Sequence, residues 1–184
     1  VGGDLSASAS TNLSATGTVG GAATLSSQGD LGASLTVTGD LDMTAGGDLF
    51  GMATTTTGDV QATALGSNRM YVIGARDIDL TILGTNDNTV WAGRDLDMTA
   101  WAGMTYGTAA ADNTVSLDTN GYTSGFLRSL DNGDASLSSG GSVDLAYVQG
   151  RNVTVTALGD LTIEPYATVV SNDLTLSSGG NIAG

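Results

Sequence analysis

One short phrase recurs along the whole chain, and this repeat limits the possible folds more than any other feature of the sequence. It reads TGDLDMTAGG from Thr38, GARDIDLTIL from Gly74, AGRDLDMTAWAG from Ala92 and GRNVTVTALG from Gly150. The residue that opens each phrase stands at Asp4, Ala22, Asp40, Asp59, Asp77, Asp95, Thr114, Asp134, Asn152 and Asp173. The nearly constant spacing of these openings predicts a stack of about ten similar structural units.

Apolar and polar residues alternate within each phrase, as in Leu41-Asp42-Met43-Thr44-Ala45, which is the period of a strand with one buried face. In several phrases a second turn signal follows the first, as at Asp48 after Asp40. Each unit should therefore contain at least two short strands separated by corners. A unit this small buries its apolar face only by stacking on its neighbours. The predicted fold is all-β, a single-stranded right-handed parallel β-helix (β-solenoid) of about ten coils with a period of roughly 18–21 residues.

Stacking in this register predicts two inward columns that are apolar at every position. The first column is Leu5, Ala23, Leu41, Val60, Ile78, Leu96, Val115, Ala135, Val153 and Leu174. The second is Ala7, Leu25, Met43, Ala62, Leu80, Met98, Leu117, Leu137, Val155 and Leu176. Between them an outward column carries short polar residues, among them Asp42, Gln61, Asp79 and Asp97. One face of the solenoid should therefore be flat and polar.

The composition excludes several classes of function. The chain of 184 residues has no Cys, His or Lys, and its formal net charge is −14. Nucleic acids and anionic membranes need a cationic surface, so neither is expected as a partner, and no apolar run is long enough to insert into a membrane. Without Cys there is no disulfide and no thiolate site. Stability should come from packing and backbone hydrogen bonds.

The phrase GDLDMTAGGDL at residues 39–49 resembles the haemagglutinin-type repeat of large exoproteins of bacterial two-partner secretion, such as filamentous haemagglutinins. The passengers of β-helical autotransporters share much of this pattern and are the near alternative. The resemblance covers the whole chain. It implies a parallel β-helix that is secreted or displayed on the bacterial cell surface, with an outer-membrane transporter as a partner during secretion. No secretion domain or toxic domain of those families is present to carry over a specific activity.

A metal site is suggested only by stacked carboxylates. Coils about 4.8 Å apart would place Asp79 beside Asp97 and Asp77 beside Asp95, and calcium could neutralise such pairs. The alternative, which we favour, is that the corner carboxylates accept hydrogen bonds from turn backbone, with Arg76 and Arg94 as counter-charges. The glycine-rich nonapeptide of calcium-binding coils is absent from the sequence. We therefore predict no cofactor and little dependence on metal.

Exposed aromatic residues are the second candidate site. If Val72 and Val90 point inward, Trp91 points outward beside Ile73, and this pair could contact a glycan or pack laterally against another molecule. Trp101 is a further candidate for the same contact. The alternative is that Trp91 and Trp101 both fold over a wider corner of the middle coils. Threonine runs at 36–38, 54–57 and 154–156 suggest ice binding, but we expect them to lie on different faces.

The function that these patterns favour is structural. Catalysis is not expected, because His is absent and coils this short leave little loop for a cleft. We expect residues 1–184 to form one β-helix segment, open at both ends, within a longer chain or fibre of a bacterial adhesin or extracellular filament. Its main partner would be itself, through stacking of coils end to end. The alternative is a glycan-binding module that contacts a glycan or protein of the host cell or matrix; a polysaccharide-active enzyme or an ice-binding protein is less favoured.

Overall fold

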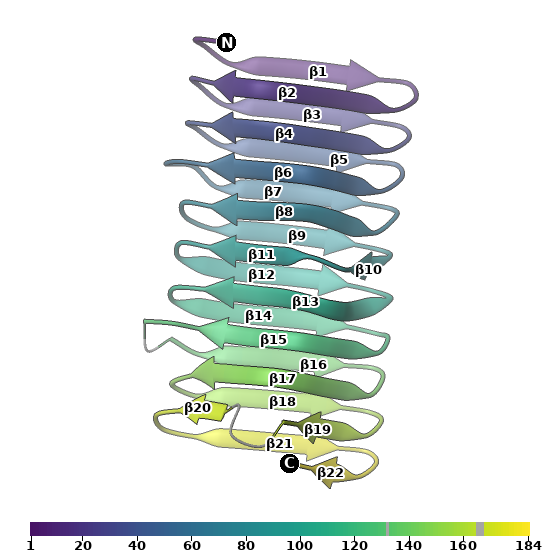
Figure 1. Ribbon diagram of the computed structural model, residues 1–184, viewed down its shortest axis with the longest axis vertical. Helices are drawn as coiled ribbons and strands as arrows, with labels where there is room; N and C mark the ends of the chain where they lie inside the picture. Colours follow the sequence, from purple (N-terminus) through teal and green to yellow (C-terminus); the bar gives the residue numbers. More distant parts are fainter. Residues whose placement is uncertain (132, 165–167) are drawn as a thin grey trace.

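The computed structural model describes residues 1–131, 133–164 and 168–184, and these residues form a β-solenoid without helices (Figure 1). Two parallel sheets run the length of the stack, and each coil contributes to both. The predicted fold class is confirmed: the chain is all-β, with about ten coils. The described residues include no helix of the length and apolarity that a membrane span requires.

Sheet A has ten strands, one from each coil. In spatial order these are β1 (Leu5–Ala9), β3 (Ala23–Ser27), β5 (Leu41–Ala45), β7 (Val60–Ala64), β9 (Ile78–Ile82), β12 (Asp95–Ala100), β14 (Thr114–Thr119), β16 (Ala135–Ser139), β18 (Val153–Ala157) and β21 (Leu174–Ser178). The turn residue that opens each repeated phrase directly precedes or begins its strand. Sheet A is therefore the part of the coil that the repeated phrase encodes.

Sheet B has twelve strands, because two of its coils carry two shorter strands each. They are β2 (Leu13–Val19), β4 (Leu31–Val37), β6 (Leu49–Thr55), β8 (Asn68–Gly74), β10 (Thr85–Asn86), β11 (Thr89–Ala92), β13 (Gly103–Ala111), β15 (Thr123–Ser129), β17 (Val143–Gly150), β19 (Leu161–Ile163), β20 (Thr168–Val170) and β22 (Ile182–Ala183). β10 and β11 share one coil, and β19 and β20 share another.

The chain winds in a right-handed sense. With the N-terminus at the top of Figure 1, the more distant strands of sheet A run to the right, and the nearer strands of sheet B run back to the left as the chain descends. A right-handed crossover is the usual connection between parallel strands, because it suits their twist. The predicted handedness therefore agrees with the path of the chain.

The predicted register of sheet A is confirmed in every coil. Leu41 pairs with Val60, Val60 with Ile78 and Ile78 with Leu96, and the second column continues Met43, Ala62, Leu80 and Met98 in the same way. These residues are buried, except in the two terminal coils, where one side of the column has no neighbour within the described chain. The outward residues between them are exposed along most of the sheet. A period of two residues thus fixes both faces of sheet A.

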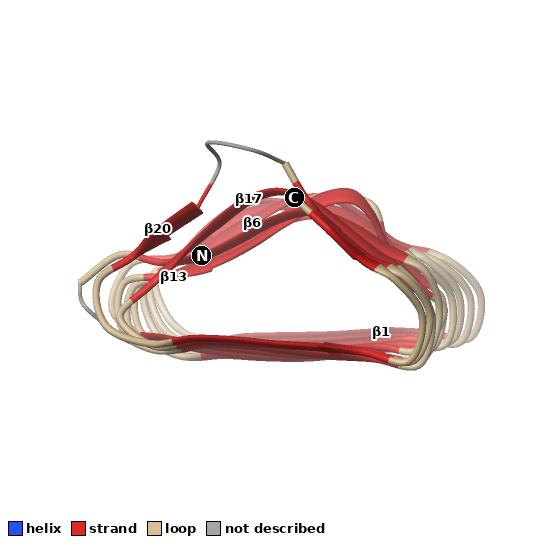
Figure 2. Cartoon of the chain, turned by 90° about the horizontal axis from the view of Figure 1, so that it is seen from below, coloured by secondary structure: helices blue, strands red, loops and turns tan. Residues whose placement is uncertain are grey.

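The two sheets differ in shape. Seen along the solenoid axis, sheet A is flat, whereas sheet B is bent outward in the middle (Figure 2). The bend coincides with glycines in the left-handed region, Gly51 (φ 108°) and Gly125 (φ 129°), and with shifts of register in β13 and β15. At Gly51 an added Cβ would lie 2.0 Å from the carbonyl oxygen of Ala33 in the previous coil. Only glycine therefore fits this position of the bend.

Two asparagines occupy inward positions of sheet B at which the preceding coils have leucine. Leu31 and Leu49 begin β4 and β6, and the equivalent residues of the next coils are Asn68 and Asn86, both fully buried. The Asn68 side chain donates to Asn86 Oδ1 at 2.7 Å and also bonds to the backbone of Met70. Because each buried amide has partners, the substitution does not leave an unsatisfied polar group.

The opposite faces of β9 provide a direct test of the register. Leu80 is fully buried between Ala62 and Met98, whereas Asp79 is exposed beside Gln61 and Asp97. We expect Leu80→Asp to lower the free energy of unfolding by more than about 4 kcal/mol, because it places an unpaired charge in the core. Asp79→Asn should change it by less than about 0.5 kcal/mol. Chemical denaturation followed by circular dichroism measures both, and equal stability of the two variants would show that the inward and outward faces are exchanged.

Candidate functional site

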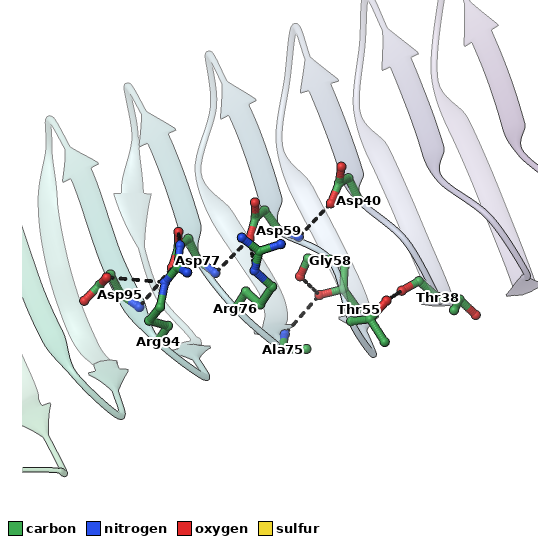
Figure 3. A network of polar contacts seen from close by, with 11 residues as sticks. Thr38, Asp40, Thr55, Gly58, Asp59, Ala75, Arg76, Asp77, Arg94 and Asp95 are labelled. Carbon is green, nitrogen blue, oxygen red and sulfur yellow. Dashed lines mark hydrogen bonds and ion pairs between the residues drawn. The ribbon is translucent and has the colours of Figure 1, made fainter.

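The corners before sheet A carry a ladder of aspartates that connects consecutive coils. Asp40 Oδ1 accepts the backbone N–H of Asp59 at 3.0 Å, and Asp59 Oδ1 accepts the N–H of Asp77 at 3.2 Å. Asp77 Oδ1 in turn accepts the N–H of Asp95 at 3.3 Å (Figure 3). Each carboxylate therefore binds the backbone of the equivalent residue one coil later. This contact is the turn-backbone hydrogen bond that the sequence favoured over a metal ligand.

A second ladder runs along the corners before sheet B. Asp30 Oδ1 accepts the N–H of Asp48 at 3.0 Å, and Asp48 Oδ1 accepts the N–H of Ser67 at 2.8 Å. Towards the C-terminus Asp160 Oδ1 accepts the N–H of Asn181 at 2.8 Å. The two ladders use the same chemistry at both corners. Most corner aspartates thus have a structural role, since they satisfy backbone donors that the turns leave free.

Threonines add further contacts at the corner between β6 and β7. Thr55 is buried at the end of β6, where its hydroxyl donates to the carbonyl of Gly58 at 2.8 Å and accepts the N–H of Ala75 at 3.0 Å. The hydroxyl of Thr57 donates to the carbonyl of Thr38 in the previous coil. Figure 3 shows this network beside the aspartate ladder. Two hydroxyls of one corner are therefore bound to backbone groups of their own coil and of the coils on both sides.

Arginines neutralise the ladder in the middle of the stack. Arg94 Nε donates to Asp77 Oδ1 at 2.6 Å, and its terminal nitrogen contacts the second oxygen of the same carboxylate. Arg76 lies 3.4 Å from Asp59. The hydrogen bond from Arg94 lowers the pKa of Asp77 below its ordinary value, although partial burial opposes the shift. Arg76 and Arg94 are thus counter-charges of the corner carboxylates, as the sequence suggested.

The four proposed calcium ligands fall into two groups. Asp77 and Asp95 belong to the corner ladder, where their oxygens bind backbone N–H groups, Arg94 and the side-chain amide of Asn113. Asp79 and Asp97 point outward from sheet A as directly paired neighbours of adjacent strands. Within the described residues no cluster of three acidic side chains has the geometry to hold a metal ion. A hollow of about 420 Å³ lies over this region and is lined by all four aspartates.

The aromatic candidates lie at two separate places. Trp91 in β11 is outward and pairs with Ile73 of β8, and both side chains are more than a third exposed. Their predicted outward orientation and contact are confirmed. Trp101 directly follows β12, so it lies at the corner between β12 of sheet A and β13 of sheet B, where it is exposed. The interpretation that both tryptophans cover a corner is therefore wrong for Trp91, whereas Trp101 does lie at a corner with an exposed side chain.

Three residues that the sequence did not single out enlarge the surface around Trp91. Phe50 and Met52 of β6 and Tyr71 of β8 are exposed on the same face of sheet B, and Met52 pairs with Tyr71. The ring of Phe50 lies over Gly32 of the previous coil, where an added Cβ would meet it at 2.4 Å. The bend of sheet B places three consecutive residues of β6 outside, so strict alternation could not identify this patch.

The threonine runs lie on different faces, as expected. Thr36 of β4 pairs with Thr54 of β6 in sheet B, whereas Thr154 and Thr156 belong to β18 in sheet A. On the outward face of sheet A, the neighbours of Thr154 and Thr156 in the previous coil are Ser136 and Ser138. A single file of threonines does run along the outward face of sheet A, through Thr44, Thr63, Thr81 and Thr99. The outward column beside it consists of Asp42, Gln61, Asp79 and Asp97, so these strands carry no array of Thr-x-Thr pairs.

Comparison with protein-family models, with curated proteins and with solved structures finds no significant match.

The pairing of Asp77 with Arg94 predicts a pH-dependent contribution to stability. The pKa of Asp77 in the folded chain is lower than its ordinary value of 3.8. The ionised carboxylate therefore stabilises the fold fully above pH 3.8, and this stabilisation is lost as the pH falls through the folded-state pKa. Asp77→Asn should reduce the free energy of unfolding at pH 7 by about 1 kcal/mol or less, because the pair is exposed. The difference from the unsubstituted chain should disappear once the pH falls below the lowered folded-state pKa of Asp77.

Denaturation of both proteins across pH 2.5–7 measures this difference. Asp40→Asn is the matched control, because Asp40 accepts the same ladder hydrogen bond and forms no ion pair within the described residues. An Asp77→Asn effect that does not vary with pH would assign the role of Asp77 to its hydrogen bond alone.

Metal dependence is tested directly by calcium. We expect millimolar calcium to leave the melting temperature unchanged, because Asp77 and Asp95 already bind backbone donors and side chains. A thermal melt with calcium, with magnesium and with chelator makes the comparison. An increase of several degrees that chelator reverses, and that Asp79→Asn with Asp97→Asn abolishes, would establish a calcium site on the outward face of sheet A.

Proposed function

We propose that this chain is a structural segment of an elongated fibre or stalk on a bacterial surface, within a large secreted adhesin or extracellular filament. The support is the regularity of the stack: both sheets pass through all the coils, sheet A keeps one register throughout, and backbone hydrogen bonds at equivalent corner positions join most coils to the next. Ten coils span about 48 Å at the spacing of parallel strands. Such a segment can lengthen a fibre by repeating the contact that already joins its own coils.

The terminal coils carry the observation on which this proposal rests. At the first coil Leu5, Ala7 and Leu13 pack against the core but stay partly exposed, and a hollow of about 320 Å³ lies beside them. At the last coil Leu174 and Ile182 are exposed beside a hollow of about 450 Å³. The backbone edges of β1 and β21 have no partner on one side within the described residues.

Open edges of this kind favour stacking against another coil of the same structure. A parallel strand laid on β21 would accept and donate the same hydrogen bonds that β21 makes with β18, and its inward residues would extend the two apolar columns. The proposed partner is therefore a further coil, either of the same polypeptide or of a second copy stacked head to tail. The resemblance of GDLDMTAGGDL to haemagglutinin-type repeats supports secretion through an outer-membrane transporter and display at the cell surface.

The proposal predicts that the 184-residue chain associates end to end. We expect sedimentation velocity to show mass that increases with concentration, and negative-stain images to show rods whose width stays constant while their length varies. Uncapped solenoid ends that bury apolar side chains on contact provide the driving force. A stable monomer at high concentration, with slow hydrogen exchange in β1 and β21, would contradict this role.

Charged variants of β21 separate end stacking from lateral contact. Leu176→Lys places a charge in the inward column that a stacked coil would cover, and it should suppress rod growth. Ser177→Lys adds the same charge to the outward face of the same strand and should leave rods unchanged. If the outward variant abolished association and the inward variant did not, the contacts would be lateral.

A further inference from the structure

The corner that follows each strand of sheet A carries a column of residues that changes character along the stack. In coil order the residues are Ser10, Gln28, Gly46, Leu65, Leu83, Trp101, Asn120, Gly140, Leu158 and Gly179. Backbone hydrogen bonds fix this alignment: the N–H of Trp101 bonds to the carbonyl of Ile82, and the N–H of Leu158 bonds to the carbonyl of Ser139. Three consecutive coils therefore present large apolar side chains, two present Asn120 and Gly140, and the next presents Leu158.

The change creates a hollow between two apolar walls. Trp101 and Leu158 are 58% and 72% exposed, and they stand on either side of the two coils whose corner residues are polar or lack a side chain. The hollow has a volume of about 320 Å³, at the lower end of the range of small-ligand pockets. Its remaining lining residues are Thr99, Asp118, Thr119, Asn120, Ser138, Ser139, Gly140 and Thr156.

Gly140 keeps the hollow open. A Cβ at this position would lie 2.4 Å from Oδ1 of Asn120 and 2.9 Å from its carbonyl oxygen. Any side chain here would displace Asn120 or fill the space above it. The opening therefore depends on two residues of the corner column, Asn120 and Gly140.

The polar lining is available to a ligand. Within the described part of the chain the side chains of Thr99, Asp118 and Asn120 form no hydrogen bond with another residue, and Asp118 and Asn120 are exposed. Ser138 stands beside Asp118 in the outward column of sheet A, and Thr156 stands beside Ser138. By contrast Thr119 and Ser139 are buried and already bound, to Thr123 and to the carbonyl of Gly121.

We propose that this hollow binds a neutral saccharide, with a sugar ring stacked on the indole of Trp101. An indole face presents a large apolar surface for the C–H face of a pyranose. The hydroxyls, amide and carboxylate of the lining offer donors and acceptors to several sugar hydroxyls at once. Asp118 is the only charged side chain among the lining residues, so most of the lining suits an uncharged polyol better than an ion. Anionic sugars are disfavoured by Asp118 and by a net charge of −14.

This inference does not rest on the proposed fibre role, and it assigns Trp101, rather than the Ile73 and Trp91 surface, as the glycan contact. The test uses the fact that the chain contains two tryptophans. In Trp91→Leu the only indole is Trp101, so its fluorescence reports this hollow alone. We expect at least one of maltohexaose, cellohexaose, mannohexaose and hexa-N-acetylchitohexaose to shift or quench this signal, and hexagalacturonate to have no effect.

Two variants locate the binding by isothermal calorimetry with the same oligosaccharide. Trp101→Leu removes the aromatic face and should weaken affinity about tenfold or more. Asn120→Leu fills the hollow and should abolish binding. Leucine is the residue of this corner in three other coils, so both variants should keep the melting temperature of the unsubstituted chain.

Trp91→Leu is the matched control and should bind like the unsubstituted chain. The proposal fails if none of the four neutral oligosaccharides binds at millimolar concentration. It also fails if Trp101→Leu binds as well as the unsubstituted chain, if Trp91→Leu alone abolishes binding, or if hexagalacturonate binds best.

Discussion

The hydrogen bonds between neighbouring coils are the interaction on which the rest of the structure depends. Each strand of sheets A and B pairs in parallel with the equivalent strand of the next coil, so its backbone groups are satisfied only if that coil returns to the same height and register. This requirement keeps the period of the repeat nearly constant along the chain. The aspartate ladders extend the same requirement into the corners, where Asp59 and Asp77 bind the backbone one coil ahead. The length of each coil, the register of its strands and the residues at its corners therefore all follow from the hydrogen bonding between coils.

Sheet A could be predicted from the sequence residue by residue, whereas sheet B could not. In sheet A a corner aspartate or asparagine sets the first residue of most strands, and strict alternation then assigns every side chain, as at Leu80 and Asp79. In sheet B the glycines of the bend shift that alternation, and Phe50 and Met52 emerge on the surface on either side of Gly51. The buried Asn68 and Asn86 pair was missed for a related reason. Part of the hydrogen bonding of these amides joins the two coils, and this contact exists only after the coils have stacked.

The same stacking explains how the chain tolerates its net charge of −14. Aspartates of successive coils stand close together, and unbalanced carboxylates at this spacing repel one another. Corner aspartates avoid this by accepting backbone N–H groups, and four of the five arginines pair with them, namely Arg69, Arg76, Arg94 and Arg151. The fifth, Arg128, lies over the ring of Tyr147. Nine acidic residues of the described chain accept a backbone N–H in this way, so the number of acidic residues does not by itself indicate a metal site.

A regular stack confines specific chemistry to the positions where the repeat changes. Identical coils would present identical side chains at every corner, so all corners would have the same outline. The hollow beside Trp101 forms where large residues stand in some coils and small or polar ones in the coils between them, as with Trp101, Asn120, Gly140 and Leu158. The inward columns cannot vary in this way, because their volumes must fill the core. Outward and corner columns can, since they contribute little to the core. Stability therefore constrains the inward columns, whereas the corner column after sheet A is free to vary, as its change from Leu65, Leu83 and Trp101 to Asn120 and Gly140 illustrates.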